Sequence, residues 1–436
     1  MNAATQRPSH LALRLLTAAL APALAPAVWA QSTPTDEPQT IVVTGTKRPQ
    51  LEQQVSQSAN VLTADELIND YDAYDALVRL PNVSANSRGR LPTVRGVDAS
   101  GVATGSGAAL SGGRPRFTTY VDGVARGHSF SPDGNASLWD IRQVEVYRGS
   151  QSSTLGRNAS TGAMVITTND PSDQREGAAQ LGYRSARAAW SAAGMVNLPV
   201  NSDTAVRITA EGLRGTNWRN LSLPSLQQRP LDDLEAQEFE RVRIKGLWSP
   251  QAWPGLSVRL SHDNQRDAQS NSPDLISGPD FKRRDVNEEQ TYAYFKRSNA
   301  TTALQASYEL GSGWILDGVI AHQRSKNRSV PPNGSSDPTQ LEVFANTRET
   351  SFEPKLSYAP GSSRTSVVAA PSSTIASERK VACRDRLSST TQTMTCAPTR
   401  CSAMHACRSL LRWTCCSARA SRASRSSAGS KARSSA

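Results

Sequence analysis

Cysteine is the residue type in this 436-residue sequence that first suggests site chemistry. All six cysteines lie in one C-terminal stretch: Cys383, Cys396, Cys401, Cys407, Cys415 and Cys416. The second, third and fourth are separated by four and then five residues, which is not the paired Cys-x-x-Cys spacing of a zinc site. The cysteines therefore predict no metal centre.

Glycine-rich stretches could hold nucleotides, but their spacing is wrong for that role. Gly105-x-Gly107 does not continue into a dinucleotide fingerprint, and residues 149–162 lack the Gly-Lys-Ser/Thr of a phosphate loop. Signatures of metalloproteases, nucleophile elbows and kinases do not occur, and the five histidines form no cluster in the sequence. We therefore expect neither an enzyme nor a cofactor.

The first thirty residues predict export. Two arginines precede a run of Leu, Ala and Val over residues 15–28, and small residues near Ala30 match a signal-peptidase site. Pro22 and Pro26 interrupt the run, which argues against the alternative of a buried helix. No later stretch approaches the roughly 18 apolar residues of a membrane helix. We expect residues 1–30 to be a signal peptide.

The formal net charge of +11 is concentrated at the C-terminal end. Residues 371–436 hold twelve Lys or Arg and two acids, so +10 of the charge lies there and the rest of the chain is close to neutral. A nucleic-acid-binding surface spread over the fold is therefore not expected. Because residues 371–436 show no apolar periodicity, we interpret them as an unstructured tail, either a frameshifted reading of the gene or a basic disordered segment.

Residues 51–172 mix helix and strand signals. Thr63 followed by Glu66 is a capping-box pattern, and an apolar helical stripe ends at Pro81. Four short strand patterns follow, each bounded by turn residues, and a Gly/Ser/Ala-rich loop over residues 98–116 separates the second pattern from the first. These signals predict a compact α/β domain.

From about residue 173 the apolar periodicity changes to two. In the run 239–248, Val242, Ile244 and Trp248 alternate with Arg241, Arg243 and Lys245. Such strands fit either a soluble sandwich or a membrane barrel with a polar lumen. Aromatic residues near strand ends favour the barrel, and so do short turns such as 311–313 that alternate with long polar loops at 216–235, 263–289 and 327–340.

Four motifs resemble the plug domain of TonB-dependent outer-membrane receptors. They are "VRLPNV" (78–83), "TVRGV" (93–97), "TYVDGV" (119–124) and "VEVYRGSQSSTLGRNASTGAMVITTNDP" (144–171). The resemblance implies a mainly β fold, with the plug inside an antiparallel transmembrane barrel of roughly 22 strands. It also implies energy-coupled uptake of a scarce nutrient, most often a ferric chelate such as a siderophore and sometimes cobalamin or a sugar. The implied partners are TonB, outer-membrane lipid and the ligand, with no nucleic acid.

The resemblance also assigns roles to residues. Thr40, Ile41, Val42, Val43 and Thr44 are similar to the TonB box, which recruits the energy-transducing partner by strand pairing; the alternative is a first strand of the plug.

Arg95 and Arg148 correspond to plug arginines that pair with barrel glutamates, and the alternative for them is ordinary surface arginine. Arg114, Arg116, His128 and Phe130 fall at the plug apex that faces the ligand, and the alternative for the two arginines is solvated loop charge.

The expected domains are a signal peptide (1–30), a TonB-box segment and linker (31–50), the plug (51–172), a partial barrel (173–370) and the tail (371–436). Residues 173–370 suffice for roughly 8 to 10 strands, fewer than a plugged barrel needs. We therefore expect a truncated member of the family, active or inactive. The alternative is a secreted soluble β-rich binding or structural protein with a plug-like module.

Overall fold

The computed structural model of the chain describes eighteen segments. They are residues 42–43, 50–51, 58–67, 73–84, 92–99, 116–126, 137–151, 159–185, 189–216, 221–222, 236–270, 275–277, 284–286, 294–330, 341–358, 366–369, 373–385 and 391–396. Expectations for residues 1–40 and 397–436 lie outside this part of the chain.

An N-terminal domain is built on a five-stranded sheet of order β3-β9-β10-β7-β8, in which β10 and β7 are parallel and the other neighbours antiparallel. Its strands are β3 (Ala59–Thr63), β7 (Phe117–Val121), β8 (Val124–Arg126), β9 (Ile141–Arg148) and β10 (Gly162–Thr168). Two short helices, α2 (Ala64–Leu67) and α3 (Ala73–Val78), accompany it. A three-stranded sheet consists of β4 (Val83–Ser84), β5 (Thr93–Val94) and β6 (Val97–Asp98).

The Glu66 half of the predicted capping box is present at the start of α2. The backbone N–H of Thr63 donates to Glu66 Oε2 at 2.8 Å, and the Thr63 hydroxyl lies 3.2 Å from the same oxygen. Leu67 and Leu77 from the helices then join the sheet residues Val144 and Met164 in one buried apolar cluster. The apolar stripe in the sequence is therefore the face that covers the sheet.

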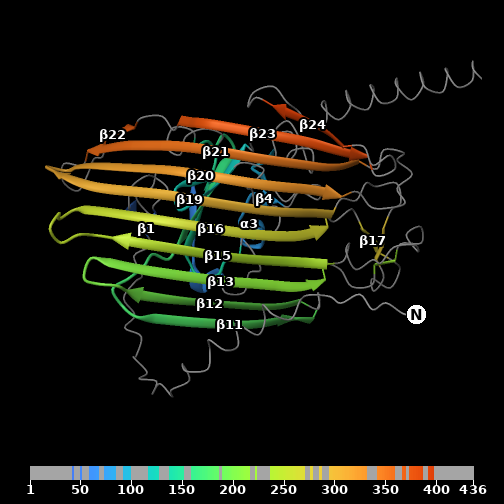
Figure 1. Cartoon of the computed structure of the whole chain (residues 1–436), viewed down its shortest axis with the longest axis horizontal. Coiled ribbons are helices and arrows are strands. Elements are labelled where there is room, and N and C mark those ends of the chain that lie inside the picture. Colours follow the sequence, from blue (N-terminus) through green and yellow to red (C-terminus); the bar gives the residue numbers. More distant parts are fainter. Residues whose placement is uncertain are drawn as a thin grey trace, which may run out of the picture. The chain divides into compact units, whose positions relative to one another are not determined.

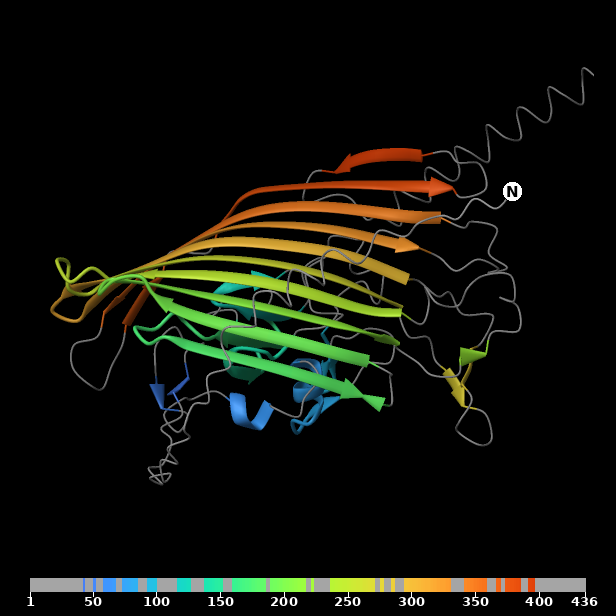
Figure 2. The same cartoon turned by 60° about the horizontal axis from the view of Figure 1, so that its bottom comes forward.

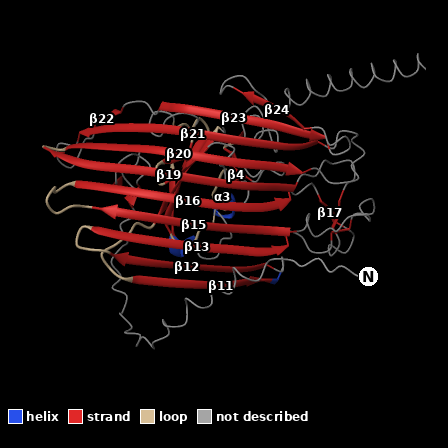
Figure 3. Ribbon diagram, viewed as in Figure 1, coloured by secondary structure: helices blue, strands red, loops and turns tan. Residues whose placement is uncertain are grey.

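A second, eleven-stranded sheet contains most of the remaining described residues. Ten strands follow one another, each antiparallel to the next: β11 (Glu176–Arg184), β12 (Ala189–Pro199), β13 (Thr204–Thr216), β15 (Ala236–Trp248), β16 (Leu256–Ser270), β19 (Tyr294–Gly311), β20 (Trp314–Val330), β21 (Leu341–Tyr358), β23 (Ser373–Asp385) and β24 (Thr391–Cys396). The eleventh, β22 (Ser366–Ala369), pairs with β21. Figures 1 and 3 show these strands side by side in chain order.

Two smaller sheets complete the described strands. β1 (Val42–Val43) pairs with β2 (Gln50–Leu51), and β18 (Arg284–Val286) pairs with both β14 (Leu221–Ser222) and β17 (Leu275–Ser277). Among the described residues, no helix has the length and apolar character needed to cross a membrane.

The large sheet is curved, as Figure 2 shows, and its two faces differ in chemistry. On β15 the side chains of Arg241, Arg243 and Lys245 are 7%, 3% and 1% exposed, whereas Val242 and Ile244 are 46% and 43% exposed. A soluble sheet has the opposite pattern, because burying apolar side chains is what stabilises it in water. The charged face is covered by the N-terminal domain, as the contacts below demonstrate.

Tight turns join the strands at one end of the sheet. β19 and β20 are connected through Ser312 and Gly313, which have φ angles of 51° and 84°. Positive φ at both central residues matches the hairpin turn whose twist suits the flanking strands. The short turn predicted at residues 311–313 is therefore present.

The strands extend farther than expected at the opposite end. Residues 263–270 and 327–330 fit the long polar loops of the sequence prediction, but they continue β16 and β20. Most residues there are polar in type, so the apolar alternation disappears while backbone pairing continues. These strand ends are defined by hydrogen bonds between main-chain groups, and such bonds leave no pattern in the residue types.

The expectation that everything beyond residue 370 is unstructured is wrong for two segments. β23 pairs with β21, and β24 pairs with β23, over residues 373–385 and 391–396. The edge of β21 offers unpaired backbone donors and acceptors to any extended neighbour that lacks proline, whatever its side chains. The frameshift hypothesis itself stays a prediction.

Candidate functional site

Three aspartates of the N-terminal domain lie in turns that face the large sheet. Asp122 follows β7, Asp140 precedes β9 and Asp170 follows β10. Asp122 accepts hydrogen bonds from the backbone N–H and hydroxyl of Thr168, at 2.9 and 2.7 Å. Asp140 accepts one from Asn169 at 2.9 Å. These bonds tie the turns to each other and direct the carboxylates outward from the domain.

Cations of β13 and β15 meet all three of these aspartates. Arg207 Nη2 lies 2.6 Å from Asp140 Oδ1, and Arg243 Nη2 lies 3.6 Å from Asp140 Oδ2. Lys245 Nζ lies 3.0 Å from Asp122 Oδ2 and 3.2 Å from Asp170 Oδ1. Each side chain in these pairs, except that of Asp170, has 12% exposure or less. Removing either partner of such a buried pair leaves the other charge without compensation, which is strongly destabilising.

The contact continues onto β11 and β16. Arg207 Nη1 also lies 3.1 Å from Glu176 Oε2, and Arg259 Nη2 lies 2.7 Å from Asp170 Oδ2. Thus the cations of three neighbouring strands, β13, β15 and β16, hold the carboxylates of the N-terminal domain.

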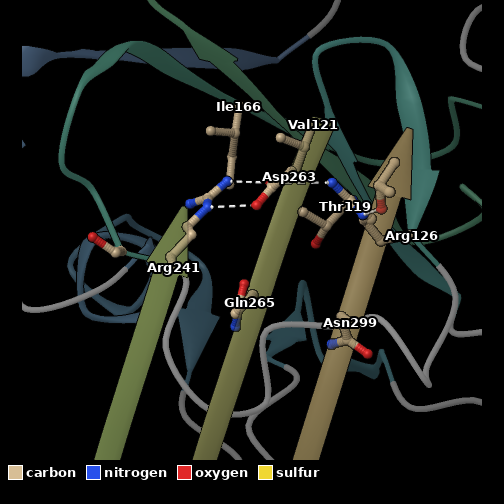
Figure 4. A pocket seen from close by; sticks show the side chains of 10 residues that line it. Thr119, Val121, Arg126, Ile166, Arg241, Asp263, Gln265 and Asn299 are labelled. Carbon is tan, nitrogen blue, oxygen red and sulfur yellow. Dashed lines mark hydrogen bonds and ion pairs between the residues drawn. The ribbon is translucent and has the colours of Figure 1, made fainter. Parts of the chain in front are cut away.

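Asp263 of β16 is shared by two arginines that approach it from opposite sides, as Figure 4 shows. Arg241 Nε and Nη2 donate to its two carboxylate oxygens at 3.0 and 2.7 Å. Arg126, from β8 of the N-terminal domain, lies 3.7 Å away. The bidentate Arg241–Asp263 pair lies within the large sheet, whereas the longer Arg126–Asp263 pair joins the sheet to the N-terminal domain.

A polar cavity of about 40 Å³ lies beside this group. Asp263, Arg126 and Arg241 line it together with Asn299 and Thr301. Asn299 Oδ1 is buried without a hydrogen-bond partner among the described residues. A pocket of this volume has room for a water molecule, which needs such polar partners.

Neutral side chains of the sheet also contact the domain. Gln305 donates to the carbonyl oxygen of Asp122, and Gln323 Nε2 donates to that of Ala125 at 3.1 Å. The Ser137 hydroxyl donates to Glu211 of β13. The turn between β7 and β8 is thereby held through its main chain as well as its carboxylate.

The charges around the turn set the ionisation of its residues. Burial alone would raise the pKa of Asp122, but the charges of Lys245 and Arg243 and the hydrogen bonds from Thr168 outweigh it, so the pKa is lowered. Burial lowers the pKa of Arg126, and the charge of Asp263 opposes that effect. The carboxylate of Asp122 is therefore stabilised in its charged form.

The sequence assigned the docking role to Arg95 and Arg148, and the described contacts of both remain inside the domain. Arg148 Nη1 donates to the Pro81 carbonyl oxygen at 2.9 Å, and the guanidinium of Arg95 lies beside Gly149. The ion pairs described above have the opposite polarity from the expected one, with carboxylates on the domain and cations on the sheet, except for Arg126–Asp263. The pairing of Arg95 and Arg148 with glutamates stays a prediction.

The other predicted site residues lie partly outside the described part of the chain. Thr40, Ile41, Thr44, Arg114, His128 and Phe130 are all outside it. Arg116 is exposed at the start of β7, where its backbone N–H donates to the carbonyl of Ala99 at 2.8 Å. Val42 and Val43 form β1, which pairs with β2 and not with the five-stranded sheet.

The aspartates of the contact were missed because each looks like ordinary turn chemistry. Asp122 stands in "VDGV" and Asp170 in "NDP", where aspartate is common for local reasons. The sequence did signal the cations, since the alternation over 239–248 places Arg241, Arg243 and Lys245 on one face. The pattern did not indicate which residues of the N-terminal domain contact that face.

A small α/β domain held by charged side chains against one face of a long-stranded antiparallel sheet defines the plug-and-barrel class of protein. Comparison with known proteins agrees. Residues 52–163 match the model of the TonB-dependent Receptor Plug Domain. The chain is 30% identical over 193 residues to the vitamin B12 transporter BtuB of Vibrio vulnificus, covering 42% of this chain and 30% of that protein. It is 24% identical over 331 residues to the pesticin receptor of Yersinia pestis, covering 74% and 46%.

Solved structures share the fold. The ferric yersiniabactin uptake receptor FyuA from Yersinia pestis superposes with a TM-score of 0.55 at 17% identity, covering 78% of this chain and 60% of that one. The ferripyoverdine receptor of the outer membrane of Pseudomonas aeruginosa superposes with a TM-score of 0.60 at 12% identity, covering 81% and 46%. These matches support the TonB-dependent receptor family for this chain, and the family model itself covers the plug domain at residues 52–163. The chain spans between about a third and about half of the length of these two curated relatives.

Proposed function

We propose that this chain serves energy-coupled uptake of a scarce nutrient, a ferric chelate, across the outer membrane of a Gram-negative cell. The observation that carries the proposal is the inverted chemistry of β15. Its cations face the plug and its apolar side chains Val242 and Ile244 face away, with 46% and 43% exposure. In a membrane the outward side chains contact lipid and the inward ones contact a wet lumen. The domain seated on that lumen face is in the position of a plug.

The same inversion argues against a soluble binding protein. Leu181, Trp190 and Leu260 of the large sheet are 83%, 65% and 55% exposed, and among the described residues no other layer covers them. A soluble sandwich would bury such side chains against a second sheet. Apolar exposure on this scale marks an interaction surface, and lipid is the partner that fits a whole sheet face.

The ferric chelate is supported by the fold and by relatives. The structural relatives named above are described as receptors for ferric yersiniabactin and ferripyoverdine. The transporter of Vibrio vulnificus is described as carrying vitamin B12, which makes a cobalamin the competing ligand.

The energy-transducing partner TonB would act on residues 40–44. Val42 and Val43 pair with Gln50 and Leu51 through only two residues on each strand. A two-stranded pair of that length is marginal in water, so it can exchange for a strand edge of a partner. β-Branched side chains favour the extended conformation that such pairing needs.

The location is tested by fractionating cells that express the full chain. We expect urea-resistant, heat-modifiable migration in the outer-membrane fraction. Recovery of the whole folded protein in the soluble periplasmic fraction would end the proposal.

Coupling is tested with Val42→Pro, because proline cannot donate to a strand ladder. The variant should bind a radiolabelled ferric chelate as the parent does and should lose its uptake. Thr35→Pro is the matched control, since that segment already carries Pro34 and Pro38. Equal uptake by Val42→Pro and the parent would remove the coupling role. Uptake of cobalamin but of no ferric chelate would mean that the ligand is a cobalamin, and the proposed coupling mechanism would stand.

A further inference from the structure

The outward face of the large sheet carries two zones on β16, β19, β20 and β21. The first is an apolar row aligned by strand register and 40–55% exposed: Leu260, Leu304, Ile320 and Phe352. The next row toward the far ends of the strands is His262, Thr302, His322 and Thr350. His262 and His322 each lie 2.9 Å from the threonine hydroxyl of the following strand.

Beyond that row the same face becomes basic. The next two rows contain Arg324, Arg348, Arg266 and Lys326, all exposed, and the third row adds Lys296 and Arg328. We call these six residues the basic cluster. Successive outward residues on a strand are about 6.6 Å apart, so the cluster starts within two such steps of the apolar row.

Few acids lie on this face near the basic cluster. Arg348 Nη1 is 4.0 Å from Glu378 Oε2, and Glu240 stands opposite Arg266 in register. Glu240 itself is 3.3 Å from Arg214. Arg324 Nε donates to His322 Nε2 at 3.2 Å, and the guanidinium of Arg328 lies 5.5 Å from the ring centroid of Phe344. Glu238 also stands on this face, in the row of Lys296 and Arg328. Among the described residues, six cations against three flanking acids leave the cluster net positive.

The cluster lies at the end of the strands opposite the tight turn at Ser312 and Gly313. In membrane barrels the short turns face the periplasm and the long connections face outward. In a membrane the cluster would therefore lie on the outer-leaflet side of the apolar row.

We propose that the basic cluster binds the phosphate groups of an anionic lipid of the outer leaflet, with the acyl chains of that lipid lying along the apolar row. This rests on the proposed function, because it needs the sheet to stand in a membrane. Guanidinium groups match phosphate oxygens bidentately, and adjacent strands present several of them to one headgroup. A lipid with two phosphates fits the cluster better than one with a single phosphate, since the cations occupy more than one row.

The test uses the full chain in phosphatidylcholine nanodiscs that contain a small fraction of bis-phosphorylated lipid A. Native mass spectrometry of the protein released from the disc measures the lipid A retained. The test variant replaces Arg266, Arg324 and Lys326 with Gln. The control variant replaces three exposed arginines outside the cluster with Gln: Arg142, Arg175 and Arg184. Heat-modifiable migration of each protein reports insertion separately.

The parent and the control should retain lipid A, and the test variant should lose about one hundredfold in affinity, since each cation near an anionic surface contributes about fivefold. Retention should weaken as ionic strength rises. A variant carrying Arg266→Lys and Arg324→Lys should keep most of the binding, because the charges remain.

Three results would overturn the proposal while leaving membrane insertion intact. They are equal retention of dephosphorylated lipid A, equal loss in the control variant, or displacement of lipid A by the same concentration of inorganic phosphate. Failure of the parent to insert would instead count against the proposed function.

Discussion

The ammonium group of Lys245 lies 3.0 Å from a carboxylate oxygen of Asp122, which makes a buried ion pair between strand β15 and the β7–β8 turn of the plug. Lys245 is 1% exposed and also reaches Asp170. This lysine joins two loops of the plug to the large sheet, which is the wall of the barrel, through a single side chain. The pair therefore offers a direct test of how the two parts are held together.

Lys245→Met should destabilise the contact strongly. The substitution leaves Asp122 and Asp170 without their shared cation, and removing one partner of a buried pair costs about 3–5 kcal/mol. Urea unfolding of the detergent-solubilised chain, followed by tryptophan fluorescence, measures the effect. Arg214→Met is the control, because the Arg214–Glu240 pair is exposed and such pairs contribute about 0–1 kcal/mol. Similar losses in both variants would contradict the assignment of Lys245.

The stability of the plug should fall with acid in a way that depends on Asp122. Its pKa in the folded chain is lowered from the ordinary 3.8, so its contribution is complete above the pKa of the unfolded chain. The contribution disappears as the pH falls through the folded pKa, and the loss therefore begins below about pH 4. Unfolding from pH 7 to pH 3 should show a shallower decline in Asp122→Asn than in the parent. The exposed Asp65→Asn should follow the parent curve, and a parallel curve for Asp122→Asn would exclude the role.

Asp263 should couple more strongly to Arg241 than to Arg126. Arg241 forms two hydrogen bonds of 3.0 and 2.7 Å to its carboxylate, whereas Arg126 lies 3.7 Å away. Double-mutant cycles with Asp263→Asn and each Arg→Gln measure the two coupling energies. We expect about 1–3 kcal/mol for Arg241 and less than about 1 kcal/mol for Arg126. The reverse order would mean that the plug, and not the wall, holds Asp263.

Gly162→Ala should disturb the plug sheet where β10 begins. A Cβ there would lie 2.5 Å from the Tyr147 carbonyl oxygen and 3.0 Å from the Phe117 ring, and the carbonyl cannot move without its strand. Overpacking of this kind costs about 1–3 kcal/mol. Limited proteolysis of the plug measures the loss. Gly318→Ala in β20 is the control, because its Cβ would meet nothing within 4 Å, and equal sensitivity of the two variants would contradict the prediction.

The elements of this chain were largely predictable because their signals are local. The capping box at Thr63 and Glu66 and the alternation along β15 both depend on neighbours in sequence. The plug strands carry recognisable motifs, and the model of the plug domain covers residues 52–163. Local chemistry is sufficient to place such segments.

The partners across the contact were not predictable. Asp140 and Arg207 are 67 residues apart, and their ion pair depends on how the plug is seated against β13. Strand register decides which cation faces which turn, and no residue type encodes register over that separation. The pairing of Arg95 and Arg148 with glutamates stays a prediction. The ends of β16 and β20 escaped prediction because most of their residues are polar in type and show no apolar alternation.

The distribution of charge across the contact gives any movement of the plug an electrical consequence. Of the residues described at this contact, the wall supplies five cations, Arg207, Arg241, Arg243, Lys245 and Arg259, against three acids, Glu176, Glu211 and Asp263. The plug supplies the balancing carboxylates. A plug that withdrew would uncover a lumen wall with an excess of two positive charges, so part of the work of displacement is the separation of opposite charge. The passage left behind would attract anions.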